Sequence, residues 1–208
     1  RSTLMRSSAA SDVYKRQLDQ PGLVKNTEYQ RYSYRVNTDL NIGKMLKVSS
    51  DVTYRHVDRL WPESLGSVQY DVWSMQPTSP VRYENGDYRL DKQNRNAISL
   101  MDLDVVGEDR YNMDVVYGQV KADFEPIKDL VFTGMASLNG SWDRRKIHYK
   151  NYKYYNEAGE LVTQRNNPNS VKDSRNNSYQ MTLRFLANYK KRCLLYTSDA
   201  ADDRISVD

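Results

Sequence analysis

The residues that could carry out chemistry in this chain are scattered, and they form no catalytic or metal-binding pattern. The two histidines, His56 and His148, are far apart and have no carboxylate or cysteine at the spacing of metal ligands. A short acidic cluster lacks the regular ligand spacing of a calcium loop; its members are Asp102, Asp104, Glu108 and Asp109. We therefore expect no enzyme, no metal site and no cofactor.

Aromatic rings in a polar, proline-containing stretch suggest a binding role instead. Flat rings beside polar residues are suited to stacking on sugars. The candidates for substrate contact are Trp61, Tyr70, Trp73, Tyr83 and Tyr88. Residues 144–155 also mix basic and aromatic side chains, as nucleic-acid surfaces do. An extracellular strand extension whose lysines face water or anionic lipopolysaccharide accounts for this run better, and we expect no nucleic-acid partner.

The elements that position these residues are indicated by alternation. Between Tyr29 and Ile42, apolar residues occupy the even positions and polar residues the odd ones. Because neighbouring side chains of a β-strand point to opposite sides, this pattern predicts a strand with one apolar face. Two structures fit it: a sheet of a soluble protein with one buried face, and the wall of an outer-membrane barrel.

The same alternation recurs in about five stretches, near residues 29–42, 46–56, 116–124, 130–143 and 179–190. Their connections are alternately short, at 43–45 and 125–129, and long, at about 59–111 and 144–175. The second long connection contains an expected small hairpin, with strands at 152–155 and 161–164. Such long connections are unusual in compact soluble domains but are typical of extracellular loops of barrels. The pattern predicts an all-β fold, an antiparallel transmembrane β-barrel fragment.

Composition is compatible with this prediction. The chain has 208 residues, a net charge of +4 and a mean hydropathy of -0.85, values that ordinarily indicate a soluble protein. Barrel strands escape hydropathy measures because only every second residue is apolar. No apolar run approaches the roughly 18 residues of a transmembrane helix. The single cysteine, Cys193, leaves the body of the chain without a disulfide framework.

Both ends look foreign to the rest of the chain. Residues 1–17 and 193–208 resemble translated sequencing-adapter read-through. We expect them to be non-native tails, as an expression scar would be, and take residues 18–192 as the genuine sequence, a partial barrel.

The order of motifs between about residues 24 and 191 resembles the barrel of SusC/RagA-type TonB-dependent transporters, the large outer-membrane importers of Bacteroidota. Residues Tyr32–Leu40 and Lys44–Val48 resemble that family's "R-x-N" strand, tight turn and "L-K-V" return strand. Residues Pro80–Tyr88 resemble its "P-x-Y-x-x-x-G-x-Y" loop segment. Residues Asn96–Leu100 resemble its "N-P-x-x-x-L" motif, with Ala97 in place of the usual proline.

The resemblance implies energy-coupled import of glycans or peptides through a plugged barrel of roughly 22 strands in the bacterial outer membrane. The implied partners are outer-membrane lipid, a SusD-like surface lipoprotein that lids the barrel, the TonB complex and an oligosaccharide or peptide substrate. The plug and the TonB-contacting segment lie outside this sequence. Two alternatives remain open: a passive outer-membrane porin, and a soluble extracellular β-protein that binds carbohydrate.

Overall fold

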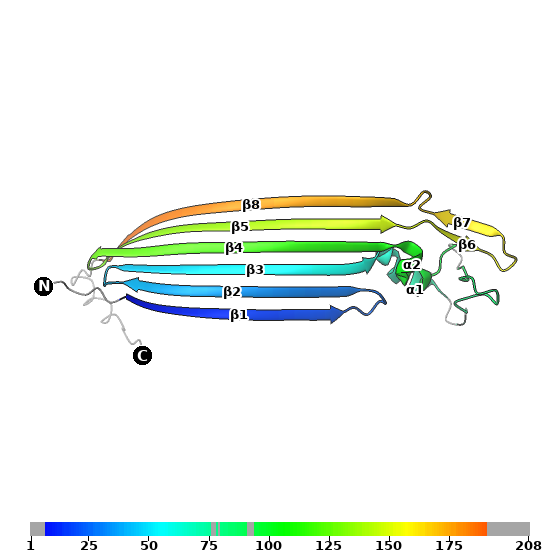
Figure 1. The fold of residues 1–208 in the computed structure, drawn as a ribbon, viewed down its shortest axis with the longest axis horizontal. Helices are drawn as coiled ribbons and strands as arrows, with labels where there is room; N and C mark the ends of the chain where they lie inside the picture. Colours follow the sequence, from blue (N-terminus) through cyan, green and yellow to red (C-terminus); the bar gives the residue numbers. More distant parts are fainter. Residues whose placement is uncertain (1–6, 76–77, 79, 91–93, 191–208) are drawn as a thin grey trace, which may run out of the picture.

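A computed structural model describes residues 7–75, 78, 80–90 and 94–190. Six antiparallel strands form a single layer, in the order β1-β2-β3-β4-β5-β8, and shorter elements gather at one end (Figure 1). The strands are β1 (Ser7–Pro21), β2 (Glu28–Ile42), β3 (Leu46–Pro62), β4 (Glu108–Ile127), β5 (Leu130–Tyr149) and β8 (Ser170–Tyr189). The prediction of an antiparallel β fold is confirmed, although the described strands form an open sheet and not a closed barrel.

The two short reversals are placed as predicted. Residues 43–45 connect β2 to β3, and Gly43 has a φ of 65° there, a left-handed conformation that glycine adopts without strain. β4 ends at Ile127 and β5 begins at Leu130, so the second reversal is tighter than the predicted 125–129. Both reversals lie at the same end of the sheet.

The sheet has one strand more than the five predicted. Residues 7–21, most of which were set aside as a non-native tail, form β1 and pair along their whole length with β2, from Ser7 opposite Ile42 to Pro21 opposite Glu28. The exposed backbone edge of β2 accepts this partner because backbone pairing depends little on side-chain identity. The foreign origin of residues 1–17 stays a prediction, and residues 193–208 lie outside the described part of the chain.

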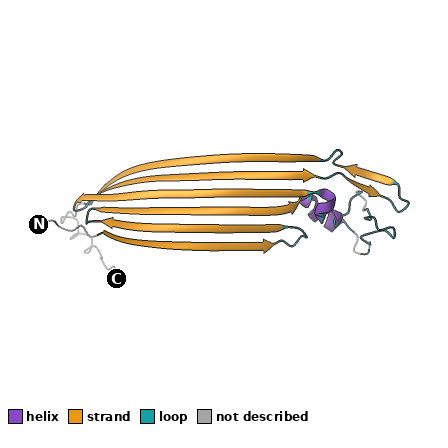
Figure 2. Ribbon diagram, viewed as in Figure 1, coloured by secondary structure: helices purple, strands orange, loops and turns teal. Residues whose placement is uncertain are grey.

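The strands continue beyond the stretches that alternate. β3 reaches Pro62, β5 reaches Tyr149 and β8 begins at Ser170, so the predicted loops 59–111 and 144–175 are too long at both ends. The connection between β3 and β4 holds α1 (Leu65–Ser74), the short 3-10 helix η1 (Ser99–Met101) and α2 (Leu103–Val106), drawn in purple in Figure 2. The connection between β5 and β8 contains β6 (Tyr152–Tyr155) and β7 (Leu161–Arg165), which confirms the predicted small hairpin.

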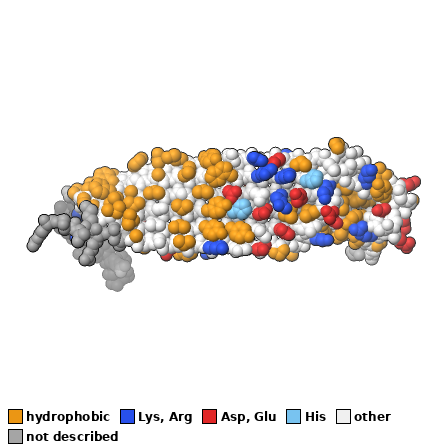
Figure 3. All heavy atoms as spheres, in the orientation of Figure 1, with side chains coloured by type: hydrophobic (Ala, Val, Ile, Leu, Met, Phe, Trp, Pro, Cys, Tyr) orange, Lys and Arg blue, Asp and Glu red, His pale blue; other side chains and the backbone are white. Residues whose placement is uncertain are grey.

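The pairing register sorts the sheet into two faces. Tyr34 pairs with Tyr54, Tyr54 with Val116, and Phe124 with Phe132, so even positions share one face on β2 to β5. The register between β5 and β8 pairs Leu138 with Met181 and so brings odd positions of β8 to the same face. Figure 3 shows a face on which hydrophobic side chains gather over the half of the sheet near the short reversals, and charged side chains over the other half.

No helix in the described part of the chain combines the length and the hydropathy that a membrane crossing requires.

The two outer strands of the sheet, β1 and β8, pair on one side only within the described residues. Their free edges are 15 and 20 residues long and present unpaired backbone groups. We expect the isolated chain in detergent to self-associate into β-rich assemblies of mixed size, as measured by size-exclusion chromatography with light scattering. A monodisperse species with heat-modifiable migration in SDS gels, from residues 18–192 alone, would contradict this expectation.

Candidate functional site

The connections at the far end of the sheet from the short reversals, the described residues of 63–107 and 150–169, are here called the loop layer. They carry a small core of their own, in which Val68, Leu100 and Val106 are buried. Tyr152 of β6 packs against this core, as does Val24 from the β1–β2 connection. The loop layer is therefore held together by burial of apolar side chains and not only by its attachment to the strands.

A buried amide fixes the path of the polypeptide within the loop layer. The side chain of Asn96 is fully buried, and its Nδ2 donates hydrogen bonds to the carbonyl oxygens of Val81 (3.1 Å) and Arg89 (2.7 Å). Its Oδ1 accepts from the backbone N–H groups of Ile98 (3.0 Å) and Ser99 (3.1 Å). All the donors and acceptors of the amide are used. Asn96 therefore joins two segments of the chain without leaving a buried polar group unpaired.

Tyr154 connects the small hairpin to the rest of the loop layer. Its ring is 3% exposed, and its hydroxyl shares a hydrogen bond with the hydroxyl of Ser99. Burial raises the pKa of the Tyr154 phenol to about 12. The neighbouring ring of Tyr152 meets it edge to face, with 5.3 Å between ring centroids.

Gly107 marks the place where the loop layer joins the sheet. Its φ is 97°, and a Cβ atom on it would lie 1.9 Å from the carbonyl oxygen of His148. This close approach lets the backbone N–H of Lys150 donate to the carbonyl of Val106 (3.1 Å) and that of Glu63 donate to the carbonyl of Gly107 (3.2 Å). The ends of β3 and β5 are tied to the loop layer at this point.

Two of the five predicted substrate-contact residues project from α1. Tyr70 and Trp73 are 61% and 84% exposed and, being three residues apart, share one side of the helix. Val68 and Asp71 of the same helix are buried. Trp73 is therefore an exposed aromatic ring in the loop layer.

The other three predicted contact residues are half-buried and already packed. The guanidinium of Arg59 covers the ring of Trp61 at 3.9 Å from its centroid, and Arg82 covers Tyr88 at the same distance. Tyr83 lies in the same turn, residues 81–89, where its backbone N–H donates to the carbonyl of Asp87 at 2.9 Å. The five rings do not converge on one pocket, and their contact with substrate stays a prediction.

A charged cluster that alternation did not predict lies on the polar face beside Trp61. Asp109 is 4% exposed and accepts two parallel hydrogen bonds from Arg145, at 2.9 Å from Nε and 2.6 Å from Nη2. The second arginine, Arg59, lies 3.6 Å from the same carboxylate. Burial lowers the pKa of the Arg59 guanidinium, whereas the hydrogen bonds to Asp109 raise the pKa of Arg145. The one sign of this cluster in the sequence is that its three members occupy odd positions, which place them on the polar face of their strands.

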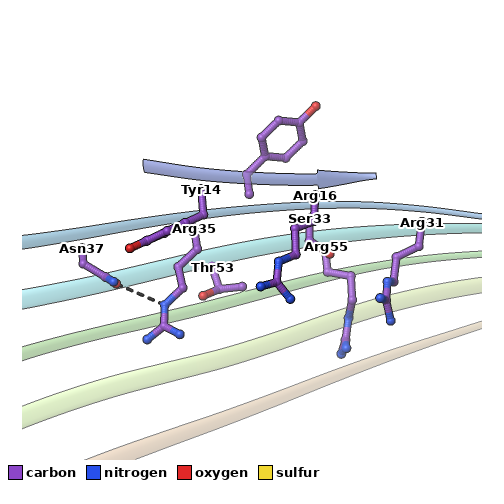
Figure 4. A pocket seen from close by; sticks show the side chains of 9 residues that line it. Tyr14, Arg16, Arg31, Ser33, Arg35, Asn37, Thr53 and Arg55 are labelled. Atoms are coloured by element: carbon purple, nitrogen blue, oxygen red, sulfur yellow. Dashed lines mark hydrogen bonds between the residues drawn. The ribbon is translucent and has the colours of Figure 1, made fainter. Parts of the chain in front are cut away.

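Nearer the middle of the same face, a hollow of about 490 Å³ crosses β1, β2 and β3 (Figure 4). Its lining is rich in arginine and consists of Tyr14, Arg16, Arg31, Ser33, Tyr34, Arg35, Asn37, Thr53 and Arg55. Arg35 forms an ion pair with Asp51 and donates to the Asn37 side chain. The hollow presents planar N–H donors and positive charge, which together suit oxygen-bearing anions.

His56 and Asp102, a member of the acidic cluster, form local hydrogen bonds. Nδ1 of His56 lies 2.8 Å from Asp114, which also accepts a hydrogen bond from Tyr54. Asp102 accepts from the backbone of Asp104 at the start of α2. The described part of the chain contains no group of three or more side chains placed to hold a metal ion.

Compared with protein-family models and with curated proteins, the chain matches none.

The buried phenol of Tyr154 predicts a loss of loop-layer stability at high pH. An unfolded tyrosine ionises near pH 10 and the folded Tyr154 near 12, so its stabilising contribution is complete below about pH 10 and is lost as the pH rises towards 12. Proteolysis within residues 156–160 should therefore accelerate between about pH 10 and 12.

Tyr154→Phe should remove part of this pH dependence and weaken docking of the hairpin by about 0.5–1.5 kcal/mol, because the hydrogen bond between Tyr154 and Ser99 is lost while the Ser99 hydroxyl keeps its bond to the carbonyl of Asn96 (2.8 Å). Tyr155→Phe is the matched control, since it changes the same residue type one position along β6. Equal pH profiles for the wild type and Tyr154→Phe would contradict the assignment.

Proposed function

We propose that this chain is part of the wall of an outer-membrane β-barrel, and that the barrel belongs to an energy-coupled importer. The observation that carries the proposal is a charge-free band on one face of β2, β3, β4, β5 and β8. On β3 the outward row of this band runs Leu46, Val48, Ser50, Val52 and Tyr54. On β8 it runs Tyr189, Ala187, Phe185, Leu183, Met181 and Tyr179. Lipid tails accept such a row and reject unpaired charge.

The height of the band suits a bilayer. From Phe132 to Trp142, β5 rises about 33 Å at roughly 3.3 Å per residue, and a tilt of roughly 40° reduces this to about 25 Å. That is the typical height of the apolar belt of an outer-membrane barrel. Beyond Trp142 the same face carries Arg144 and Lys146, with Arg144 bound to Asp173 of β8 at 2.6 Å.

Aromatic residues border the band at both ends. Towards the loop layer, Tyr34 stacks on Tyr54, and the indole N–H of Trp142 donates to the Tyr179 hydroxyl at 2.6 Å. Towards the short reversals, aromatic rings again occupy this face, at Phe124, Phe132 and Tyr189. Rings with an apolar body and a polar tip favour the two membrane–water interfaces.

The opposite face has the character of a wet lumen. It carries charges of both signs, and some of them are paired, as Lys121 is with Asp123 at 2.8 Å; Asp123 also accepts from Thr133 at 2.6 Å. Short reversals at one end and a structured loop layer at the other match the periplasmic and extracellular ends of such barrels. The open edges of β1 and β8 are where further wall strands would pair.

Import, and not passive diffusion, is supported by the resemblance of residues 24–191 to SusC/RagA-type transporters. On this proposal the loop layer faces a SusD-like surface lipoprotein, a TonB complex supplies energy through regions outside this chain, and the cargo is an oligosaccharide or a peptide. Exposed Trp73 and Tyr70 would lie at the mouth, where cargo and lipoprotein meet.

A charge placed in the band tests the lipid-facing assignment. Leu138 is half-exposed on the band and lies near its middle, whereas Asn139 points to the opposite face. In the complete protein refolded into lipid vesicles, Leu138→Arg should lower the free energy of unfolding by about 2–4 kcal/mol. Asn139→Arg, its neighbour, should change it by less than about 0.5 kcal/mol. Urea titration followed by heat-modifiable migration measures both, and equal effects would contradict the assignment.

Membrane extraction and TonB binding separate the importer from its alternatives. The complete protein should remain in the outer-membrane fraction after a carbonate wash and should bind the purified periplasmic domain of TonB in a pull-down. Release by the carbonate wash would indicate a soluble carbohydrate-binding protein. Retention without TonB binding would indicate a passive porin.

A further inference from the structure

We propose that the polar face of β2 and β3 carries a binding site for an oxyanion group, a carboxylate, sulfate or phosphate ester, of the molecule that passes through the barrel. This inference rests on the proposed function and narrows its cargo to anionic molecules. The site consists of Arg31, Ser33 and Arg35 on β2 and of Arg55 on β3.

The register brings three arginines around one serine hydroxyl. Ser33 is directly paired with Arg55 on β3, while Arg31 and Arg35 lie two positions before and after it on β2. Residues two apart on a strand and residues opposite each other across strands project from the same face at short distances. Figure 4 shows the side chains of Arg31, Arg35 and Arg55 projecting from the same side of the sheet into the hollow.

The positive charge of this cluster is only partly compensated. Arg35 is paired with Asp51, but no ion pair or hydrogen bond joins Arg31 or Arg55 to another side chain in the described residues. On the same face, Arg145 is by contrast neutralised by Asp109. Two uncompensated guanidinium groups repel each other, and an anion bound between them would relieve this repulsion and accept their hydrogen bonds.

The hollow is large enough for a charged sugar or a similar group. Its volume of about 490 Å³ falls within the range of small-molecule sites, about 300–1,000 Å³. Arg16 of β1 lies on the remaining side of Ser33, opposite Arg55. Tyr14 and Arg16 of β1, which help to enclose this volume, belong to the stretch predicted to be foreign. The site is therefore assigned to β2 and β3 alone, and the assignment rests on their register and not on the volume.

The position along the strand favours a role in cargo passage. Arg55 and Ser33 lie one residue from Tyr54 and Tyr34, which border the band towards the loop layer, so the site is on the inner side of the wall just below the mouth. A lipid phosphate would have to lie on the other face of the sheet. An anion at this site therefore comes from the solute and not from lipopolysaccharide.

The test uses the complete protein purified in detergent and a chondroitin sulfate tetrasaccharide, which bears both carboxylate and sulfate groups. Calorimetry should show this probe binding at least about tenfold more tightly than an uncharged glucose tetrasaccharide, with inorganic sulfate or phosphate competing. Absence of binding, or equal binding of the uncharged sugar, would overturn the proposal.

Variants locate the site. Arg31→Gln combined with Arg55→Gln should lower the affinity for the charged probe by about tenfold or more. Arg31→Lys combined with Arg55→Lys should lower it only a few-fold, because lysine keeps the positive charge and loses only the planar, two-pronged donor of the guanidinium. Arg184→Gln is the matched control, since Arg184 lies on the same face on β8, away from the hollow, and should change affinity by less than about twofold. Unchanged affinity in the double glutamine variant would overturn the proposal.

The two proposals fail separately. If the protein binds the anionic probe but does not bind TonB, the proposal of energy-coupled import is refuted and that of the arginine site stands. If the protein binds TonB but shows no preference for the charged probe, the proposal of the arginine site is refuted and that of the importer stands. Heat-modifiable migration of each variant shows that its barrel is folded.

Discussion

Across β2, β3, β4, β5 and β8, residues of the apolar row on one strand pair with residues of the apolar row on its neighbour. Val36, for example, pairs with Val52, and Val52 pairs with Gly118. Every other feature of the sheet depends on this register. A slip of one residue would bring the arginines and aspartates of one strand to the band and its apolar side chains to the polar face. The short reversals at residues 43–45 and after Ile127 fix the register locally, because they leave no slack for a slip.

The alternation of the sequence predicted the faces of the strands correctly but not their ends. Between Arg144 and Tyr149 the backbone ladder of β5 continues unbroken, although the even positions change from apolar residues to Arg144, Lys146 and His148. Alternation in the sequence therefore indicates which face of a strand has apolar surroundings. Its loss marks the point beyond which that face carries charged side chains. The hydrogen bonds that define a strand do not require an apolar neighbour, so strand ends could not be found in this way.

Local signals predicted the parts of the candidate site that are local. The Asn156–Glu160 turn indicated the β6–β7 hairpin, and the aromatic composition of the long connection indicated exposed rings such as Trp73. The buried contacts of Asn96 and Ser99 depend on segments far apart in the chain and leave no periodic trace. The arginine cluster is equally invisible in one dimension, because Arg31 and Arg55 become neighbours only once β2 and β3 are paired in register.

The loop layer has its own core, a buried amide that uses every hydrogen bond available to it, and an attachment to the ends of β3 and β5 at Gly107. Its exposed positions, Tyr70 and Trp73 among them, take no part in the strand pairing that holds the sheet. A substitution at these positions therefore alters the surface of this layer while the strands below keep their register. The molecule separates an outer surface that can accept change from a frame whose residues constrain one another, so a new surface can arise without refolding the sheet.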